Sequence, residues 1–387
     1  MDNTFKLDRI PKELKLIFAL LEDRTPSIGI DIDWELFQTL SIHHRVFPLL
    51  HAKVKQVADR FPVRLLQWFE RRYKQNTFKM LRLSAEMECI SNLFLAQNIK
   101  TLFLKGPVLA QDLYGDLSLR TSSDLDFLIP IEHLPQAEEL LVCEGYEKDD
   151  YIETVLNDWR WRHHHVTYVH PEKGIKVEIH WRLHPGPGKE PRFHELWERR
   201  KKSVLTSSPV YLLGREDLFV FLVAHGARHG WSRLRWLVDI RQMMEMEMDW
   251  KRVCQLFFTY HHPHLGGQAI RLASCLLDAK VTGEMNPLLT KRSVKLANQA
   301  IFYLEDMINL HTDPVPKDVS SYHARHLFAL MSFNQKVLHV LCLLHPLPED
   351  TDTLPLPKSL HFLYFPLRPL LWGWRKTRKN EISRGLS

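Results

Sequence analysis

Two aspartates set two residues apart, Asp124 and Asp126, are the pair in this sequence best suited to metal chemistry. They lie in an alternating run from Ser123 to Ile129. Successive side chains of a strand point to opposite faces, so we expect both carboxylates on one face and the apolar residues between them in a core. Two like charges this close repel each other, and Mg²⁺, with oxygen ligands at about 2.0–2.1 Å, would neutralise them. Taken alone, the pair is equally consistent with solvated charge on an exposed strand.

A turn suited to phosphate precedes the acids. Lys105 is followed by Gly106 and Pro107. Glycine adopts backbone angles that other residues avoid and lets phosphate approach the main chain, and proline fits the first turn of a helix. We therefore expect strand, turn, helix and strand between residues 102 and 129.

A third carboxylate lies in a second alternating run, from Ile175 to Trp181. Alternation puts Glu178 and His180 on one face and the apolar residues on the other. A hairpin is expected here, because a shorter run at 166–169 precedes a turn at 171–174. If the second strand of this hairpin pairs beside the strand of the two aspartates, Glu178 must face them.

Together, a Leu-Lys-Gly turn, Tyr114, Arg120, the Asp-x-Asp pair and a Val-Glu-Ile-His-Trp strand resemble the nucleotidyltransferase fold. The likeness is to a group of bacterial nucleotidyltransferase-like proteins and covers roughly residues 100 to 240. It implies an enzyme that transfers a nucleoside monophosphate from a nucleoside triphosphate, with ATP as the expected donor and Mg²⁺ or Mn²⁺ as the cofactor. The catalytic and metal-binding residues that it implies are Asp124, Asp126 and Glu178.

The same resemblance extends to residues around the acids. The expected nucleotide-binding residues are Lys105, Gly106, Arg120 and Ser123. The expected acceptor-side residues are His180, His225, His229 and Asp239. For the last three, a hydrogen-bonded pin between two helices is the competing interpretation. Two features depart from the wider superfamily: Pro107 follows the glycine where a serine is usual, and the aspartate pair begins eighteen residues after Gly106, a longer gap than usual.

Composition sets broad limits on the function. A hydrophobic content of 45% and a charged content of 25% are those of an ordinary globular protein, and a net charge of +6 is too small to indicate nucleic-acid binding by itself. The five cysteines are scattered, with no Cys-x-x-Cys pair, which favours core thiols in a reducing compartment. We see no signal peptide and no transmembrane segment, and we expect a cytoplasmic protein.

The expected fold class is α+β, with a small mixed β-sheet nucleotidyltransferase core flanked by N- and C-terminal helical regions. The domain boundaries that we predict are 1–98 for the helical N-terminal region, 99–203 for the catalytic core and 204–387 for the helical C-terminal domain. The tail at 355–379 mixes aromatic and basic residues and is a candidate for weak contact with a surface. Its prolines argue against one clean amphipathic helix, so we expect the tail to fold onto the body.

Histidines cluster at 163–165, but the spacing does not favour zinc. Consecutive strand residues alternate between faces, so three adjacent histidines cannot all bind one ion. His225 and His229 lie one helical turn apart, yet no glutamate follows the first, so the metalloprotease pattern is absent.

Two other functional classes remain open. A sugar-nucleotide glycosyltransferase also uses Asp-x-Asp, but it would show an alternating β-α region before that motif, where this sequence is helical. A non-catalytic nucleotide-binding or scaffold protein is favoured by the missing serine after Gly106, whereas Glu178 argues against it. The acceptor hydroxyl is not specified by the sequence.

Overall fold

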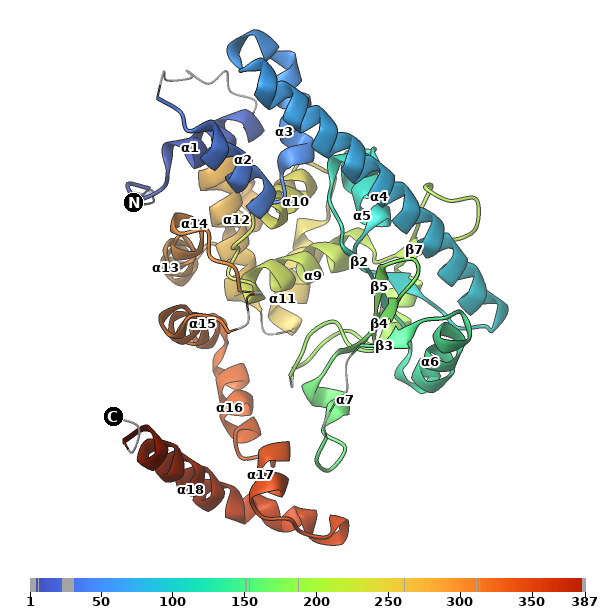
Figure 1. The fold of residues 1–387 in the computed structure, drawn as a ribbon, viewed down its shortest axis with the longest axis vertical. Coiled ribbons are helices and arrows are strands. Elements are labelled where there is room, and N and C mark those ends of the chain that lie inside the picture. The colour runs from blue at the N-terminus through green and yellow to red at the C-terminus, as the bar shows by residue number, and fades with distance from the viewer. Residues whose placement is uncertain are drawn as a thin grey trace.

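The computed structural model describes residues 5, 7–22, 31–149, 152, 154–186, 188–260, 262–310, 312 and 314–384. One mixed sheet of seven strands lies among many helices, so the expected α+β class is confirmed (Figure 1). The order of strands across the sheet is β3-β4-β5-β2-β1-β7-β6. The strands are β1 (Leu102–Phe103), β2 (Asp124–Leu128), β3 (Glu147–Lys148), β4 (His165–His170), β5 (Ile175–His180), β6 (Lys201–Lys202) and β7 (Tyr211–Leu212).

The centre of the sheet pairs the two strands that carry the acids. β2 and β5 run parallel, and Asp126 is the register partner of Glu178. Their apolar neighbours Phe127 and Ile179 are also partners and are fully buried. The predicted hairpin is present, because β4 and β5 are antiparallel.

The edge of the sheet crosses the predicted boundary at residue 203. β7 pairs parallel with β1 through Leu212 and Phe103, and β6 pairs antiparallel with β7. The sheet therefore continues to Leu212, past the predicted boundary at residue 203.

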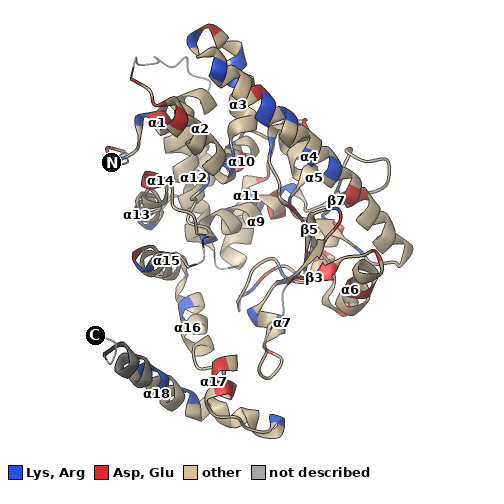
Figure 2. Ribbon diagram, in the orientation of Figure 1, with Lys and Arg blue, Asp and Glu red and all other residues tan. Residues whose placement is uncertain are grey.

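The described N-terminal residues are helical, as expected. The elements are α1 (Lys12–Leu21), α2 (Trp34–His43), α3 (Phe47–Gln56), η1 (Ala58–Arg60) and α4 (Val63–Ala96). α4 is 34 residues long and packs on the sheet, where the rings of Phe94 and Phe127 meet at 5.4 Å. Its outer face carries exposed Lys and Arg, which Figure 2 shows as blue segments along the helix.

Short helices connect the strands. They are α5 (Pro107–Tyr114), η2 (Leu117–Leu119), η3 (Ile131–His133), α6 (Leu134–Cys143), α7 (Trp159–Arg162) and α8 (Phe193–Glu198). α5 begins at Pro107 directly after the predicted turn, and α6 matches the helix that ends before Gly145.

The C-terminal half is helical and shares its packing with the N-terminal helices. Its elements are α9 (Arg215–Arg228), α10 (Leu234–Met244), α11 (Trp250–Thr259), α12 (Pro263–Leu277), η4 (Gly283–Leu288), α13 (Lys291–Ala300), α14 (Phe302–Glu305), α15 (Lys317–Leu330), α16 (Phe333–Cys342), α17 (Pro348–Thr353), η5 (Lys358–Leu363) and α18 (Tyr364–Arg384). α1 packs against α12, and Arg233 donates a hydrogen bond of 2.8 Å to the carbonyl of His43. The two helical regions therefore enclose the sheet as one structure.

The tail does not fold onto the body as expected. α18 packs on α17 and η5 and stands apart from the sheet (Figure 1). The buried Asp350 holds this unit together through ion pairs of 2.7 Å with Arg368 and Arg375. Helix α18 continues through Pro369, which lies inside the helix and donates no backbone hydrogen bond there. No described helix is long and apolar enough to cross a membrane.

Candidate active site

Two acids and a histidine meet where β2 lies beside β5. His180 Nε2 is 3.4 Å from Asp126 Oδ1 and 3.5 Å from Glu178 Oε2. One donor atom from each of the three residues lies within 4.8 Å of the others. Glu178 therefore faces the Asp-x-Asp strand as expected, and Asp126 is the aspartate that it pairs with in register.

Asp126 is fully buried, and its charge is only partly compensated. Lys105 Nζ lies 2.8 Å from Oδ1, yet neither oxygen of Asp126 accepts a well-aligned hydrogen bond from the described residues. Burial favours the neutral acid, but the charge of Lys105 and the contact with His180 outweigh it and hold the pKa of Asp126 below its ordinary value. A buried, ionised carboxylate with open acceptor positions is suited to binding a cation.

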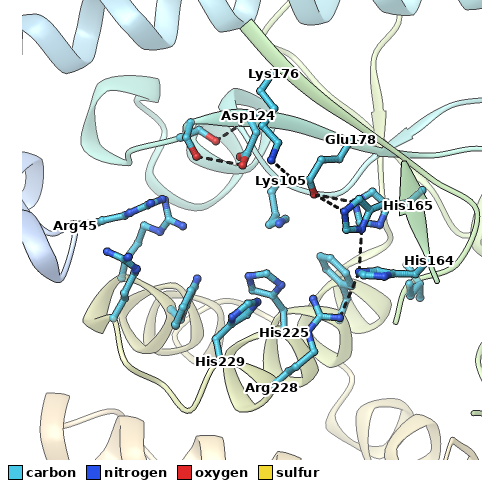
Figure 3. Close-up of a pocket in the computed structure, with 18 of the residues that line it drawn as sticks. Arg45, Lys105, Asp124, His164, His165, Lys176, Glu178, His225, Arg228 and His229 are labelled. Atoms are coloured by element: carbon cyan, nitrogen blue, oxygen red, sulfur yellow. Dashed lines mark hydrogen bonds and ion pairs between the residues drawn. The ribbon is translucent and has the colours of Figure 1, made fainter. Parts of the chain in front are cut away.

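Glu178 and His180 stabilise each other's charged forms. Burial opposes both charges, but the contact with His180 lowers the pKa of Glu178, and the contacts with Asp126 and Glu178 raise the pKa of His180. Lys176 Nζ adds a positive charge 3.4 Å from Glu178 Oε1. The carboxylate of Glu178 is thus ionised and faces the cavity (Figure 3).

Asp124 lies in the wall of the same cavity but outside this group of three. It is half-buried, and Ser123 donates a hydrogen bond of 3.1 Å to its Oδ2. The structure therefore brings Asp126, Glu178 and His180 together, with Asp124 and Ser123 farther along the same cavity.

The cavity has a volume of about 480 Å³ and is strongly cationic. The acids that line it are Asp124 and Glu178, whereas the lysines and arginines are Arg45, Lys105, Arg120, Lys176, Arg228, Arg233 and Arg235. In Figure 3, Asp124 and Glu178 lie on the strand side of the cavity, and His225, Arg228 and His229 face them from the end of α9. Arg45 enters from the N-terminal helical region. Such an excess of positive charge in a concave site favours a polyphosphate ligand.

The turn before α5 has the backbone that the sequence indicates. Gly106 has φ 88° and ψ −150° and immediately precedes the first helical residue, Pro107. This conformation is available to glycine and strained for other residues. Lys105 lines the cavity, but Gly106 is not among the lining residues.

Comparison with known proteins identifies the family to which this chain belongs. The sequence profile of a family described as "uncharacterised nucleotidyltransferase" matches residues 31–278, which is more than half of the chain. The chain belongs to this family. No curated protein matches the sequence significantly. A crystal structure of an antigenic nucleotidyltransferase-like protein from Paracoccidioides brasiliensis aligns with 52% of this chain and 94% of its own, at 17% identity and a TM-score of 0.33, which is too low to support an argument.

Within this nucleotidyltransferase family member, Arg120 and Asp239 form a buried ion pair. Arg120 Nε lies 3.1 Å from both carboxylate oxygens of Asp239, and its terminal nitrogen lies 3.0 Å from Oδ2. Tyr114 donates a further hydrogen bond of 2.8 Å to the same carboxylate. Arg120 borders the cavity, whereas Asp239 does not line it. The geometry favours the competing interpretation for Asp239, a hydrogen-bonded pin between elements. The carboxylate of Asp239 also binds the guanidinium of Arg120, which the sequence assigns to phosphate binding.

The other expected acceptor-side residues do reach the cavity. His225 and His229 line it from α9, with ring centroids 4.7 Å apart, and both rings contact Trp236. Burial holds the pKa of His225 well below its ordinary value, so its ring is neutral at physiological pH.

Sequence reasoning missed much of the cationic wall. The lining residues that it did not single out include Arg45, Arg228, Arg233 and Arg235. Arg228 could have been found, because it follows His225 by three positions and so shares its helical face. Arg45 could not, because it joins the site only through the packing of α2 and α3 against the C-terminal helices.

Proposed function

We propose that this family member is a metal-dependent nucleotidyltransferase, of the EC 2.7.7 type, that transfers a nucleoside monophosphate from a nucleoside triphosphate to a hydroxyl acceptor. ATP is the expected donor, and the expected location is the cytoplasm. The observation that carries the proposal is the buried carboxylate of Asp126, which lacks an aligned hydrogen bond and lies beside Glu178. Glu178 and Asp124 are the acids of a cavity whose other charged lining residues are lysines and arginines.

The chain's own residues fit a divalent ion. Oxygen ligands suit Mg²⁺ or Mn²⁺, and Asp126 and Glu178 would hold the ion, with Asp124 contributing from the cavity wall. When bound, such an ion neutralises phosphate charge and lowers the pKa of a coordinated hydroxyl. His180 keeps both carboxylates in place through its contacts of 3.4 and 3.5 Å.

The cationic side chains would bind the triphosphate. Lys105, Arg228 and Arg235 line the cavity around the carboxylates, and Ser123 offers a hydroxyl nearby. In the transfer, the acceptor oxygen attacks the α-phosphorus, the bond from that phosphorus to the bridging oxygen breaks, and pyrophosphate leaves. The acceptor proton passes to a carboxylate or to solvent. His225 and His229 face this space and would position the acceptor.

Calorimetry with Mg²⁺ and ATP tests the proposal. Asp126→Asn and Glu178→Gln remove charge with little change in volume, and we expect Asp126→Asn to abolish Mg²⁺-dependent ATP binding. Glu178→Gln should largely spare binding but abolish release of pyrophosphate. Glu139→Gln, on the exposed face of α6, is the matched control and should bind as the wild type does. Unchanged ATP affinity in Asp126→Asn would sink the metal-site proposal. Incubation of labelled triphosphates with cell extract would then identify the acceptor.

A non-catalytic nucleotide-binding protein is the second candidate. It is favoured by Lys105, whose Nζ lies where a cation would neutralise Asp126, and by Pro107 in the place of the usual serine. ATP binding without pyrophosphate release in the wild type would select this function. The basic C-terminal tail remains a candidate for weak contact with a surface.

A further inference from the structure

Three histidines bring their ring nitrogens together at one end of the acid site. One nitrogen from each of His164, His165 and His180 lies within 4.8 Å of the others. His165 Nδ1 is 3.2 Å from His164 Nε2. His180 also belongs to the group formed with Asp126 and Glu178, so the two groups share one residue. Figure 3 shows His164 and His165 side by side near Glu178.

The local backbone explains how two adjacent histidines reach one point. β4 begins at His165, and His164 precedes the strand. The His164 carbonyl accepts a hydrogen bond of 3.0 Å from the backbone N–H of Trp181, just past the end of β5. His165 is in turn the register partner of His180. The alternation of faces applies only inside a strand, so it does not keep His164 and His165 apart. His163 is outside the cluster, so the expectation that three adjacent histidines do not share one ion is unaffected.

One distance between donor atoms in this cluster matches that around a metal. In a tetrahedral site with Zn–N bonds of about 2.0–2.1 Å, neighbouring donors lie about 3.3–3.4 Å apart. His165 Nδ1 and His164 Nε2 are 3.2 Å apart, and a ring nitrogen of His180 lies within 4.8 Å of a ring nitrogen of each. The two adjacent histidines are therefore spaced as neighbouring ligands of one ion, with His180 close enough to be a third.

His180 itself lacks an aligned partner. Its side chain is 4% exposed, and neither ring nitrogen makes a hydrogen bond with the described residues. Buried polar atoms in native structures are nearly always satisfied. A bound cation would supply the missing contact.

The ligand types indicate the class of ion. Imidazole nitrogens prefer borderline ions such as Zn²⁺ and Co²⁺ over Mg²⁺, which prefers oxygen. We propose that His164, His165 and His180 bind a divalent transition-metal ion of the Zn²⁺ class, next to the oxygen ligands of Asp126 and Glu178. Arg228, whose terminal nitrogen now lies 3.4 Å from His164 Nε2, must turn away when the ion binds. This site goes beyond the proposed function and does not depend on nucleotide transfer.

Titration of the full-length, chelator-treated chain with Co²⁺ in excess Mg²⁺ tests the site. We expect visible ligand-field bands of bound Co²⁺, which Zn²⁺ abolishes by displacement. His165→Ala should weaken Co²⁺ binding at least tenfold. His170→Gln, at the far end of β4 and outside the cluster, is the matched control and should leave the affinity unchanged. Absence of Co²⁺ binding by the wild type, or equal affinity in His165→Ala, would overturn the proposal.

A second measurement needs no substitution. Nitrogen hyperfine coupling in the electron paramagnetic resonance spectrum of bound Cu²⁺ reports imidazole ligands directly, and its absence would overturn the proposal even if His165→Ala failed to fold.

The test of the histidine site can be distinguished from the test of the proposed function. Loss of Co²⁺ binding in Asp126→Asn together with wild-type binding in His165→Ala would place the ion on the carboxylates alone, which refutes the histidine site and leaves nucleotide transfer standing. Conversely, His165-dependent Co²⁺ binding without any binding of Mg²⁺ and ATP would refute the proposed function alone.

Discussion

Lys105 Nζ lies 2.8 Å from Asp126 Oδ1, so the chain carries an internal cation at the carboxylate that is best placed to bind a metal. The Lys105 side chain is 14% exposed and that of Asp126 is fully buried. Breaking a buried ion pair by removing one partner costs about 3–5 kcal/mol, because the other charge stays buried. We therefore expect Lys105→Met to lower the free energy of unfolding by this amount when divalent ions are absent.

The same variant should recover when Mg²⁺ is added, since the ion then neutralises Asp126. Urea unfolding with and without Mg²⁺ measures both values. A loss of stability that Mg²⁺ does not reverse would show that Lys105 has a purely structural role. Lys105→Met should also weaken triphosphate binding more than monophosphate binding, because a charged contact to phosphate contributes about 1.5–3 kcal/mol.

The Arg120–Asp239 pair gives a prediction that separates packing from nucleotide binding. Both side chains are at most 2% exposed, so Arg120→Met should destabilise the chain by about 3–5 kcal/mol. Adding Asp239→Leu and Tyr114→Phe removes the remaining polar groups, and we expect most of the stability to return. Chemical denaturation measures each step. If the refolded triple variant loses affinity for Mg²⁺ and ATP, Arg120 binds nucleotide as the sequence indicated.

Gly106 and Gly115 flank α5 and offer a matched comparison. Both have positive φ, but Gly115 lies in the left-handed helical region and Gly106 at φ 88° and ψ −150°, which side chains adopt far less readily. An added Cβ would meet only ordinary van der Waals contacts at Gly106 and open space at Gly115, so neither change causes a clash and the difference lies in backbone strain. We expect Gly106→Ala to cost about 1–3 kcal/mol and to lower nucleotide affinity. Gly115→Ala should cost less and leave affinity unchanged, and equal effects would contradict the special role of the turn.

Acid should destabilise the chain through histidines that are buried in the neutral form. Burial lowers the pKa of His326, on α15, to about 4. The unfolded residue takes up a proton near pH 6.5, whereas the native residue does not until about pH 4, so this stability is present above pH 6.5 and is lost as the pH falls. Its contribution to the loss at pH 5 is about 2 kcal/mol. His326→Gln should reduce the difference in unfolding free energy between pH 7 and pH 5 by that amount, and an unchanged difference would contradict the assignment.

The strands that carry the acids could be predicted because each has a clear alternating pattern. Asp126 and Glu178 have apolar neighbours on both sides, so the core fixes the face on which each carboxylate lies. β6 and β7 have two residues each, too few for an alternating pattern to show, and β7 therefore falls in the region predicted to be helical.

The opposite wall of the cavity depends on contacts that no local pattern contains. Arg45 follows α2, whereas Arg228 ends α9, and only the packing of the helical regions brings both to the acids. The partner of Arg120 is equally distant in sequence, so its ion pair could not be separated from a phosphate contact in advance.

The pin between Arg120 and Asp239 joins residues 119 positions apart, and this sets an order during synthesis on the ribosome. β2 and β5 emerge first, with their carboxylates, and α9 and α10 follow with the arginines and histidines. Until Asp239 has left the exit tunnel, Arg120 has no buried partner and the acids face no opposing wall. The nascent chain therefore lacks this wall of the cavity before α10 is made, and a product that ends earlier would carry the acids without the complete cavity.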